Sequence, residues 1–296
     1  MTTHVRITPE STGEFTAATV PTQWVDTRGR RLAFRQFGTG PHLVLALRFR
    51  GVMDSWDPAF LDALARDFTV TTFDYSGLGQ STGTPSYVRT DMARDILDLA
   101  DAIGLDRFAV GGWSLGGVAA QIFAAENPGR VSHAILIGTV PPGPQPHGSE
   151  PIFLETALKP VNDLADEATL FFEPAAPASV AAARASHDRI ATRSADRSPP
   201  IPPETFLPIL QASADPEAVF PDPGRYSEFF RTSDLPVLVI SGDHEIVFPV
   251  ENWHALNRQW PGLHILTIPQ AGHGPQHQQP ELIAGLIAGF TRATPL

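Results

Sequence analysis

The chain has 296 residues, of which 42% are hydrophobic, and this is enough for one large α/β domain or for a core with an insertion. The formal net charge of −11 argues against nucleic acid or an anionic membrane surface as the main partner, because both require clustered lysines and arginines. The absence of cysteine excludes disulfides, thiolate chemistry and cysteine-ligated zinc. We therefore expect a small-molecule substrate as the partner.

Residues 1–22 form a polar leader, without the basic segment and the following apolar segment of a secretory signal. No stretch of about 18 consecutive apolar residues occurs in the chain. We therefore expect a cytoplasmic protein that does not span a membrane. The oligomeric state stays open at this stage.

The first half of the chain predicts strands that alternate with helices. Residues 23–38 predict a hairpin at a sheet edge, with a turn at Gly29. Further strands are expected at 42–48, 68–76, 107–112 and 130–138, and helices at 57–67, 91–105 and 114–130. This alternation is typical of a doubly wound, mostly parallel sheet of the α/β class.

The alternation stops at "TVPPGPQPHGSEP", where proline and glycine prevent a long regular element. The segment 141–233 contains helical fragments and no clear strand. Strands are expected again at 235–242 and 263–269, and helices at 250–260 and 280–293. We therefore predict one core, made of residues 23–140 and 234–296, with residues 141–233 as a helical insertion.

A glycine-rich turn, "VGGWSLGGVAAQ", joins a predicted strand directly to a predicted helix. Gly112 and Gly116 flank Ser114 at the two positions where side chains would collide in a very tight turn. The Ser114 hydroxyl would then project near a helix N-terminus, which favours developing negative charge. The segment lacks the lysine of a Walker loop and the spacing of a dinucleotide-binding loop. Ser114 is therefore the predicted nucleophile.

Residues 111–131 resemble the nucleophile elbow and following helix of the serine esterase branch of the α/β-hydrolase superfamily. In that family the order is serine, acid, histidine. The segment "VLVISGDHEIVFP" is similar to the acid turn and implies Glu245 as the acid, with Asp243 as the alternative. The segment "PQAGHGPQHQQPE" is similar to the histidine loop and implies His273 as the general base.

The resemblance implies no cofactor. His277 follows His273 at a spacing that could bind a metal on a helix, but Gly274 and Pro275 disfavour a helix there, so no metal site is predicted.

The segment before Trp56 departs from the family pattern. Where the family usually has His-Gly, an alignment on Trp56 places Leu47 and Arg48, so the implied oxyanion donors are the backbone N–H groups of Phe49 and Leu115. One such donor typically contributes about two to three powers of ten in turnover. Possible substrate contacts are Arg48, Arg50 and Trp113; either arginine could bind an acidic group of the substrate or pair with a nearby acid.

The insertion stands where a member of the family carries its helical cap. Its phenylalanines could line an apolar pocket or serve ordinary packing. They are Phe153, Phe171, Phe172, Phe206, Phe220, Phe229 and Phe230.

The resemblance implies a hydrolase. Members that attack with an aspartate, such as dehalogenases and epoxide hydrolases, are disfavoured by the serine at position 114. We expect cleavage of a small or medium carboxylic ester or lactone through an acyl-enzyme on Ser114. Two alternatives stay open: cleavage of a C–C bond in a β-diketone-like compound by the same triad, and ligand binding without turnover.

Overall fold

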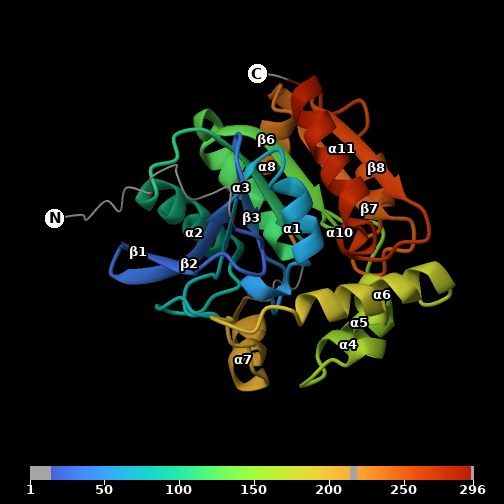
Figure 1. Ribbon diagram of the computed structural model, residues 1–296. Helices are drawn as coiled ribbons and strands as arrows, with labels where there is room; N and C mark the ends of the chain where they lie inside the picture. Colours follow the sequence, from blue (N-terminus) through green and yellow to red (C-terminus); the bar gives the residue numbers. More distant parts are fainter. Residues whose placement is uncertain (1–14, 214–218, 295–296) are drawn as a thin grey trace.

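The computed structural model describes residues 15–213 and 219–294 of the chain. Most of the expected leader, residues 1–14, lies outside the described residues, whereas Ala17 and Val20 pack into the core. Figure 1 shows a central sheet with helices on both faces and a further group of helices at one end.

An eight-stranded sheet forms the centre, in the order β1-β2-β4-β3-β5-β6-β7-β8. β1 and β2 form the predicted antiparallel hairpin at the sheet edge, and β2 pairs antiparallel with β4. All other neighbours pair in parallel, which confirms the mostly parallel sheet. The strands are β1 Gln23–Thr27, β2 Arg30–Phe37, β3 His42–Ala46, β4 Thr69–Phe73, β5 Phe108–Trp113, β6 Val131–Ile137, β7 Val237–Gly242 and β8 Leu263–Ile268.

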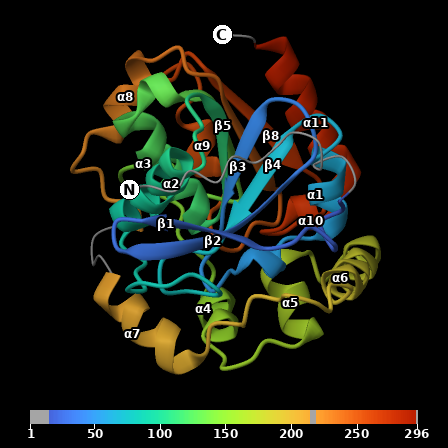
Figure 2. The same ribbon diagram turned by 60° about the vertical axis from the view of Figure 1, so that its left-hand side comes forward.

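Helices cover both faces of this sheet (Figures 1 and 2). α1 and α11 pack together on one face, and α2, α3 and α8 lie on the other. Every residue of the central strand β5 is buried, which is why its sequence reads as a continuous apolar run instead of an alternating one. These helices are α1 Pro58–Leu64, α2 Arg89–Ala102, α3 Leu115–Glu126, α8 Tyr226–Thr232 and α11 Pro280–Ala293.

Two local predictions are wrong. The helix expected at 250–260 is limited to α9, Glu251–His254. The next N–H groups, those of Leu256 and Asn257, donate to carbonyls three residues earlier instead of four, and Arg258 has a φ of 69°. The segment after His273, where no helix is expected, contains the single turn α10, Pro275–Gln278. Pro275 is the first residue of α10, where its missing N–H group costs nothing.

Among the described residues between β6 and β7, five helices lie within the predicted insertion. α4 to α7 gather at one end of the molecule (Figures 1 and 2). Residues of α4 and α5 line a cavity together with Ser114, which directly follows β5. The inserted helices therefore lie at the carboxyl ends of the parallel strands β3, β5 and β7. The insertion helices, besides α8, are α4 Pro151–Ala157, α5 Leu164–Phe171, α6 Pro177–Ile190 and α7 Pro203–Ser213.

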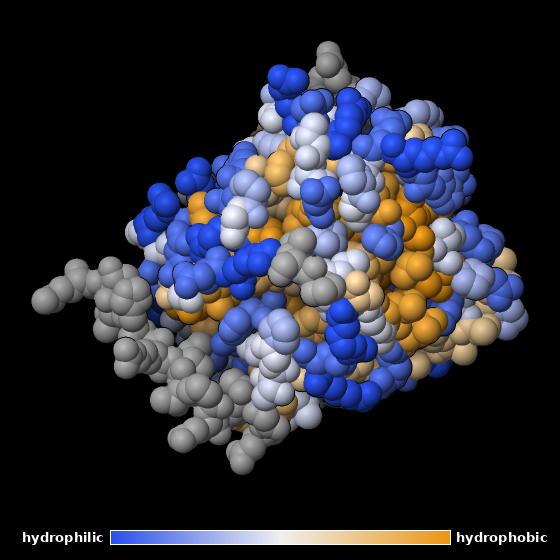
Figure 3. All heavy atoms as spheres, turned by 90° about the horizontal axis from the view of Figure 1, so that it is seen from above, coloured by the Kyte–Doolittle hydropathy of each residue, from blue (hydrophilic) through white to orange (hydrophobic). Residues whose placement is uncertain are grey.

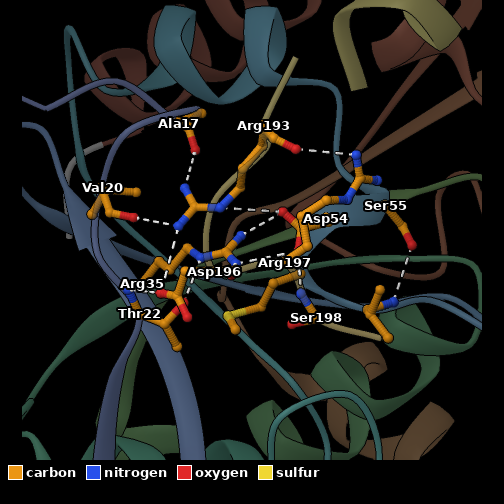
Figure 4. Close-up of polar contacts among 12 residues, drawn as sticks. Ala17, Val20, Thr22, Arg35, Asp54, Ser55, Arg193, Asp196, Arg197 and Ser198 are labelled. Atoms are coloured by element: carbon orange, nitrogen blue, oxygen red, sulfur yellow. Dashed lines mark hydrogen bonds and ion pairs between the residues drawn. The ribbon is translucent and has the colours of Figure 1, made fainter. Parts of the chain in front are cut away.

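Buried charged groups tie the chain after α6 to the core (Figure 4). The Asp54 carboxylate, in the loop after β3, lies 2.8 Å from Nη1 of Arg35 in β2 and 3.5 Å from Nε of Arg193. It also accepts a hydrogen bond from the backbone N–H of Ser198 at 2.6 Å. Moving the segment from Arg193 to Ser198 away from the sheet would leave the buried Asp54 carboxylate without two of its partners. This cost holds the segment against the sheet.

Among the described residues, no helix combines the length and the apolar character needed to cross a membrane. Figure 3 views the end opposite to α4–α7, where hydrophilic residues are interspersed with hydrophobic ones.

Candidate active site

Ser114 lies in the turn between β5 and α3, with φ of 60° and ψ of −124°. Such a backbone is rare for a residue other than glycine and persists only where its surroundings enforce it. The Ser114 N–H donates to the carbonyl of Ile137 at 2.9 Å, and its own carbonyl accepts from Thr139 Oγ1 at 2.7 Å. The strained turn is therefore held from the neighbouring strand β6 and the residues after it.

The glycines on either side of Ser114 are required by close backbone contacts. A Cβ atom on Gly112 would lie 2.1 Å from the backbone of Gly116, and a Cβ atom on Gly116 would lie 2.3 Å from the carbonyl oxygen of Ala46. Both distances are far below van der Waals contact. Only glycine therefore allows β5 to pass into α3 at this angle.

His273 and Glu245 form a buried pair on the loops after β8 and β7. Nδ1 of His273 lies 2.7 Å from Oε2 of Glu245, and the two residues are 3% and 6% exposed. The other oxygen, Oε1, accepts backbone N–H groups of Val247 at 2.7 Å and Phe248 at 3.3 Å. A carboxylate held in this way keeps the proton of a neutral imidazole on Nδ1, so that Nε2 is free to accept a proton.

Asp243, the alternative acid, contacts other groups than the His273 ring. Its Oδ1 contacts Nδ1 of the exposed His244 at 2.6 Å and accepts the backbone N–H of Ala271 at 3.3 Å. Of the two carboxylates, the structure places Glu245 against His273.

Trp113 precedes Ser114 and is fully buried. Its indole Nε1 donates to the carbonyl oxygen of His273 at 2.7 Å, and its ring packs 5.8 Å from that of Trp56, measured between ring centres. The side chain expected as a substrate contact thus also supports the backbone of the histidine loop.

The expected oxyanion donors, Phe49 and Leu115, both line a cavity that contains Ser114. Leu115 is the first residue of α3, so its N–H has no acceptor within the helix. Phe49 belongs to a turn closed by the hydrogen bond from Gly51 N to the Arg48 carbonyl at 3.0 Å.

Ser114 lines two cavities, and a third lies next to one of them. A small one of about 40 Å³ is lined by Ser114, His273 and residues of α4 and α5. It shares Ser114 and Phe49 with a mainly apolar cavity of about 290 Å³. On its other side it shares Arg48 and Phe171 with a more polar cavity of about 500 Å³. The candidate nucleophile therefore lines the small and the apolar cavity, and the polar cavity borders the small one at Arg48 and Phe171.

The insertion phenylalanines divide between two roles. Phe153, Phe171 and Phe172 line these cavities, whereas Phe206, Phe220, Phe229 and Phe230 pack into or against the core. Sequence reasoning missed Val247 and Phe248, which line the apolar cavity. Their signal was present in "EIVFP", because apolar residues directly after a buried acid must lie close to it.

The two candidate arginines have different surroundings. Arg50 donates to three carbonyls at and after the end of α4, those of Ala157 and Lys159 at 2.7 Å and of Pro160 at 3.0 Å. Arg48 lies over two rings, with its Cζ 5.2 Å from the centre of Trp113 and 4.7 Å from that of Phe171. Burial lowers the pKa of Arg48 to about 10, so it stays charged at neutral pH.

His277 is buried beside this site, with its ring centre 4.7 Å from that of Trp113. Its Nε2 accepts the backbone N–H of Asp57 at 3.3 Å. Burial lowers the pKa of His277 to about 4, so the ring is neutral at neutral pH. Within residues 15–213 and 219–294, no three His, Asp or Glu side chains are grouped so that they could hold a metal ion.

Known proteins resemble this chain in sequence and structure. A family model described as the alpha/beta hydrolase fold matches residues 41–280. The putative carbamate hydrolase RutD of Caulobacter sp. strain K31 is 26% identical over 255 residues, which cover 84% of this chain and 89% of that protein. RutD of Rhizobium rhizogenes, also a putative carbamate hydrolase, is 33% identical over 97 residues, covering 32% of this chain and 37% of that protein. The second match thus spans less than half of its relative.

Among solved structures, an alpha/beta hydrolase fold protein from Chitinophaga pinensis has a TM-score of 0.80 and 26% identity. The match covers 93% of this chain and 98% of that chain, so it includes most of the inserted helices as well as the core.

Proposed function

Because this chain belongs to the α/β-hydrolase family, we propose that it is a serine hydrolase that cleaves a carboxylic ester or lactone of modest size through an acyl-enzyme on Ser114. The observation that carries the proposal is the shared cavity of Ser114 and His273, with His273 paired to the buried Glu245. A serine hydroxyl alone is a weak nucleophile, and an imidazole oriented by a carboxylate is the usual means of activating it.

In the proposed reaction, Nε2 of His273 takes the proton of Ser114 as the hydroxyl attacks the substrate carbonyl. Glu245 stabilises the imidazolium that forms. The backbone N–H groups of Phe49 and Leu115 bind the developing oxyanion, and the α3 N-terminus adds a favourable dipole. His273 then gives its proton to the leaving alcohol, and water hydrolyses the acyl-enzyme by the same steps.

The apolar cavity supports an ester with a hydrophobic part. Its lining includes Phe49, Phe153, Leu154, Val247 and Phe248, and its volume of about 290 Å³ lies at the lower end of the usual range for ligand sites. We place the hydrophobic part of the substrate there, with the scissile carbonyl at Ser114.

A carbamate is the second candidate substrate class. The relative that aligns over 84% of this chain is named a putative carbamate hydrolase. A carbamate presents the same kind of carbonyl to a serine, so that the proposed residues would act in the same roles.

The test combines labelling with turnover. A fluorophosphonate probe is expected to modify Ser114, identified by peptide mass spectrometry, and Ser114→Ala is expected to abolish both labelling and hydrolysis of p-nitrophenyl esters of increasing chain length. Lactones and p-nitrophenyl carbamates belong in the same panel. Labelling at another residue, or hydrolysis that persists in Ser114→Ala, would contradict the proposal. Cleavage of a β-diketone in place of every ester would reassign the same residues to C–C bond hydrolysis.

A further inference from the structure

Arg48 lies at the junction of the small cavity that holds Ser114 and the larger polar cavity. Its guanidinium packs over the faces of Trp113 and Phe171, which holds its plane in a defined orientation. Phe171 belongs to α5 and Trp113 to β5, so the arginine contacts one aromatic ring of the insertion and one of the core.

Few of the Arg48 donors are used by the protein. A guanidinium has five N–H groups. Among the described residues, the one hydrogen-bond acceptor recorded for Arg48 is the Phe49 carbonyl, 2.7 Å from Nη1, and the buried Nε has no partner. A buried donor without an acceptor is costly, so an acceptor supplied by a ligand would be stabilised at this position.

The acids that line the larger cavity are engaged elsewhere. Asp54 is paired with Arg35 at 2.8 Å, and Glu167 lies 2.8 Å from Nδ1 of His187. Arg48 and Arg50 have no ion pair with a carboxylate in the part of the chain that the structure describes. The Arg50 side chain is occupied by backbone carbonyls and by Asn162, so Arg48 is the one of these two arginines that keeps free directional donors. The carboxylate of Glu167 stabilises the Arg48 charge through space and raises its pKa against the larger lowering by burial, but it is not directly paired with the guanidinium. A chain of net charge −11 thus keeps a cation without a directly paired carboxylate beside its candidate nucleophile.

From this geometry we propose that Arg48 binds a carboxylate of the substrate, so that the preferred substrate is an ester with a negatively charged group on one side of the scissile carbonyl and an apolar group on the other. This inference rests on the proposed function, since it specifies the substrate class of the same site. A planar carboxylate matches the forked guanidinium donors and stabilises them while the ring faces stay covered.

The small cavity that Ser114 and Arg48 both line limits the distance between the scissile carbonyl and the carboxylate of the substrate. At about 40 Å³ it has room for only a few non-hydrogen atoms between Ser114 and Arg48. The carboxylate should therefore be separated from the scissile carbonyl by a short chain, as in a half-ester of a short dicarboxylic acid. The hydrophobic half would occupy the apolar cavity on the other side of Ser114.

The kinetic test compares esters that differ only in charge. Mono-p-nitrophenyl glutarate is compared with its methyl ester, and carboxymethyl hexanoate with methoxycarbonylmethyl hexanoate; the first pair puts the carboxylate on the acyl side, the second on the alcohol side. We expect kcat/KM to favour the anionic member of at least one pair. In Arg48→Gln that preference should fall by roughly 10- to 100-fold, the range of a charge-assisted hydrogen bond. Arg48→Lys should recover part of it.

Arg184→Gln is the matched control. Arg184 is exposed on α6 and lies outside the lining of all three cavities, so its removal changes the net charge equally without changing the preference. A wild-type enzyme that prefers neither anionic ester, or an Arg48→Gln variant that loses the anionic and neutral rates equally, would overturn the inference, because a purely structural arginine affects both esters alike.

A binding measurement separates this inference from the proposed function. Calorimetric titration of Ser114→Ala with glutarate and with neutral glutaramide does not depend on turnover. Binding of glutarate that is lost in Ser114→Ala/Arg48→Gln supports the arginine subsite even if no ester is hydrolysed. Equal binding of glutarate in both proteins would refute the subsite even if Ser114 is labelled by a fluorophosphonate.

Discussion

Nδ1 of His273 lies 2.7 Å from Oε2 of Glu245, and the second oxygen of this carboxylate is held by backbone N–H groups. This arrangement predicts the effect of Glu245→Gln. The amide would keep most of the shape but could present its NH₂ group to the imidazole and favour the wrong tautomer, so kcat should fall by roughly 10³- to 10⁴-fold. Initial rates on the best ester of the panel measure this.

Asp243→Asn is the control for that prediction, because Asp243 contacts the exposed His244 and not His273. Its turnover should stay within about threefold of the wild type, as expected for a surface change. If Asp243→Asn removes activity and Glu245→Gln does not, the acid has been assigned to the wrong carboxylate.

Trp113→Phe tests the support of the histidine loop. The variant removes the indole N–H that donates to the His273 carbonyl at 2.7 Å and leaves that buried carbonyl without this donor. The free energy of unfolding should fall by about 1–3 kcal/mol, and kcat should fall more than KM changes, because the position of His273 matters most in the transition state. Denaturant titration and steady-state kinetics give the two quantities.

Trp56→Phe provides a matched control for Trp113→Phe. Both tryptophans are buried and their rings pack together, but the indole N–H of Trp56 has no hydrogen-bond partner among the described residues. The control should lose stability through packing alone and keep a larger share of its kcat. An equal loss of kcat in both variants would show that ring volume, and not the hydrogen bond, supports the site.

Gly112→Ala tests the steric requirement of the turn. Its Cβ would lie 2.1 Å from the backbone of Gly116, so β5 and α3 would have to separate, and we expect a destabilisation above about 4 kcal/mol or no soluble protein. Gly285→Ala in α11 is the contrast, because a Cβ there meets nothing within 4 Å. Replacing glycine in a helix should stabilise the protein by about 0.5–1 kcal/mol. A fully stable Gly112→Ala protein would contradict the packing described for this turn.

The sequence was most informative where local chemistry determines the backbone. Short runs bounded by turn residues predict β3 to β8, and a hairpin pattern with a turn at Gly29 predicts β1 and β2. The glycines around Ser114 predict a tight turn because only small residues fit there. The preference for Glu245 over Asp243 as the acid follows from the spacing of the acid turn in the family that the sequence resembles. The cavities could not be predicted, because they depend on how α4 and α5 pack over the core. The contrast between Arg48 and Arg50 likewise depends on which carbonyls the folded loops bring to each side chain.

The buried His277 should make stability depend on pH. Burial lowers its pKa from 6.5 to about 4 in the folded state, so between these values the unfolded chain binds a proton that the folded chain does not. Stability is therefore fully present above pH 6.5 and is lost as the pH falls toward 4. At pH 5 the loss from this group is about 2 kcal/mol.

His277→Gln isolates this contribution. Its side-chain oxygen can still accept the backbone N–H of Asp57, which His277 Nε2 accepts at 3.3 Å, but it does not titrate. Burial raises the pKa of Asp74 to about 6, which makes the folded state relatively more stable as the pH falls, but this effect is common to both proteins. The unfolding free energy of the wild type minus that of His277→Gln, from urea titrations at pH 7.5, 6 and 5, should therefore decrease by about 2 kcal/mol over this range. A difference that does not change with pH would mean that His277 accepts a proton in the folded protein as readily as in the unfolded chain.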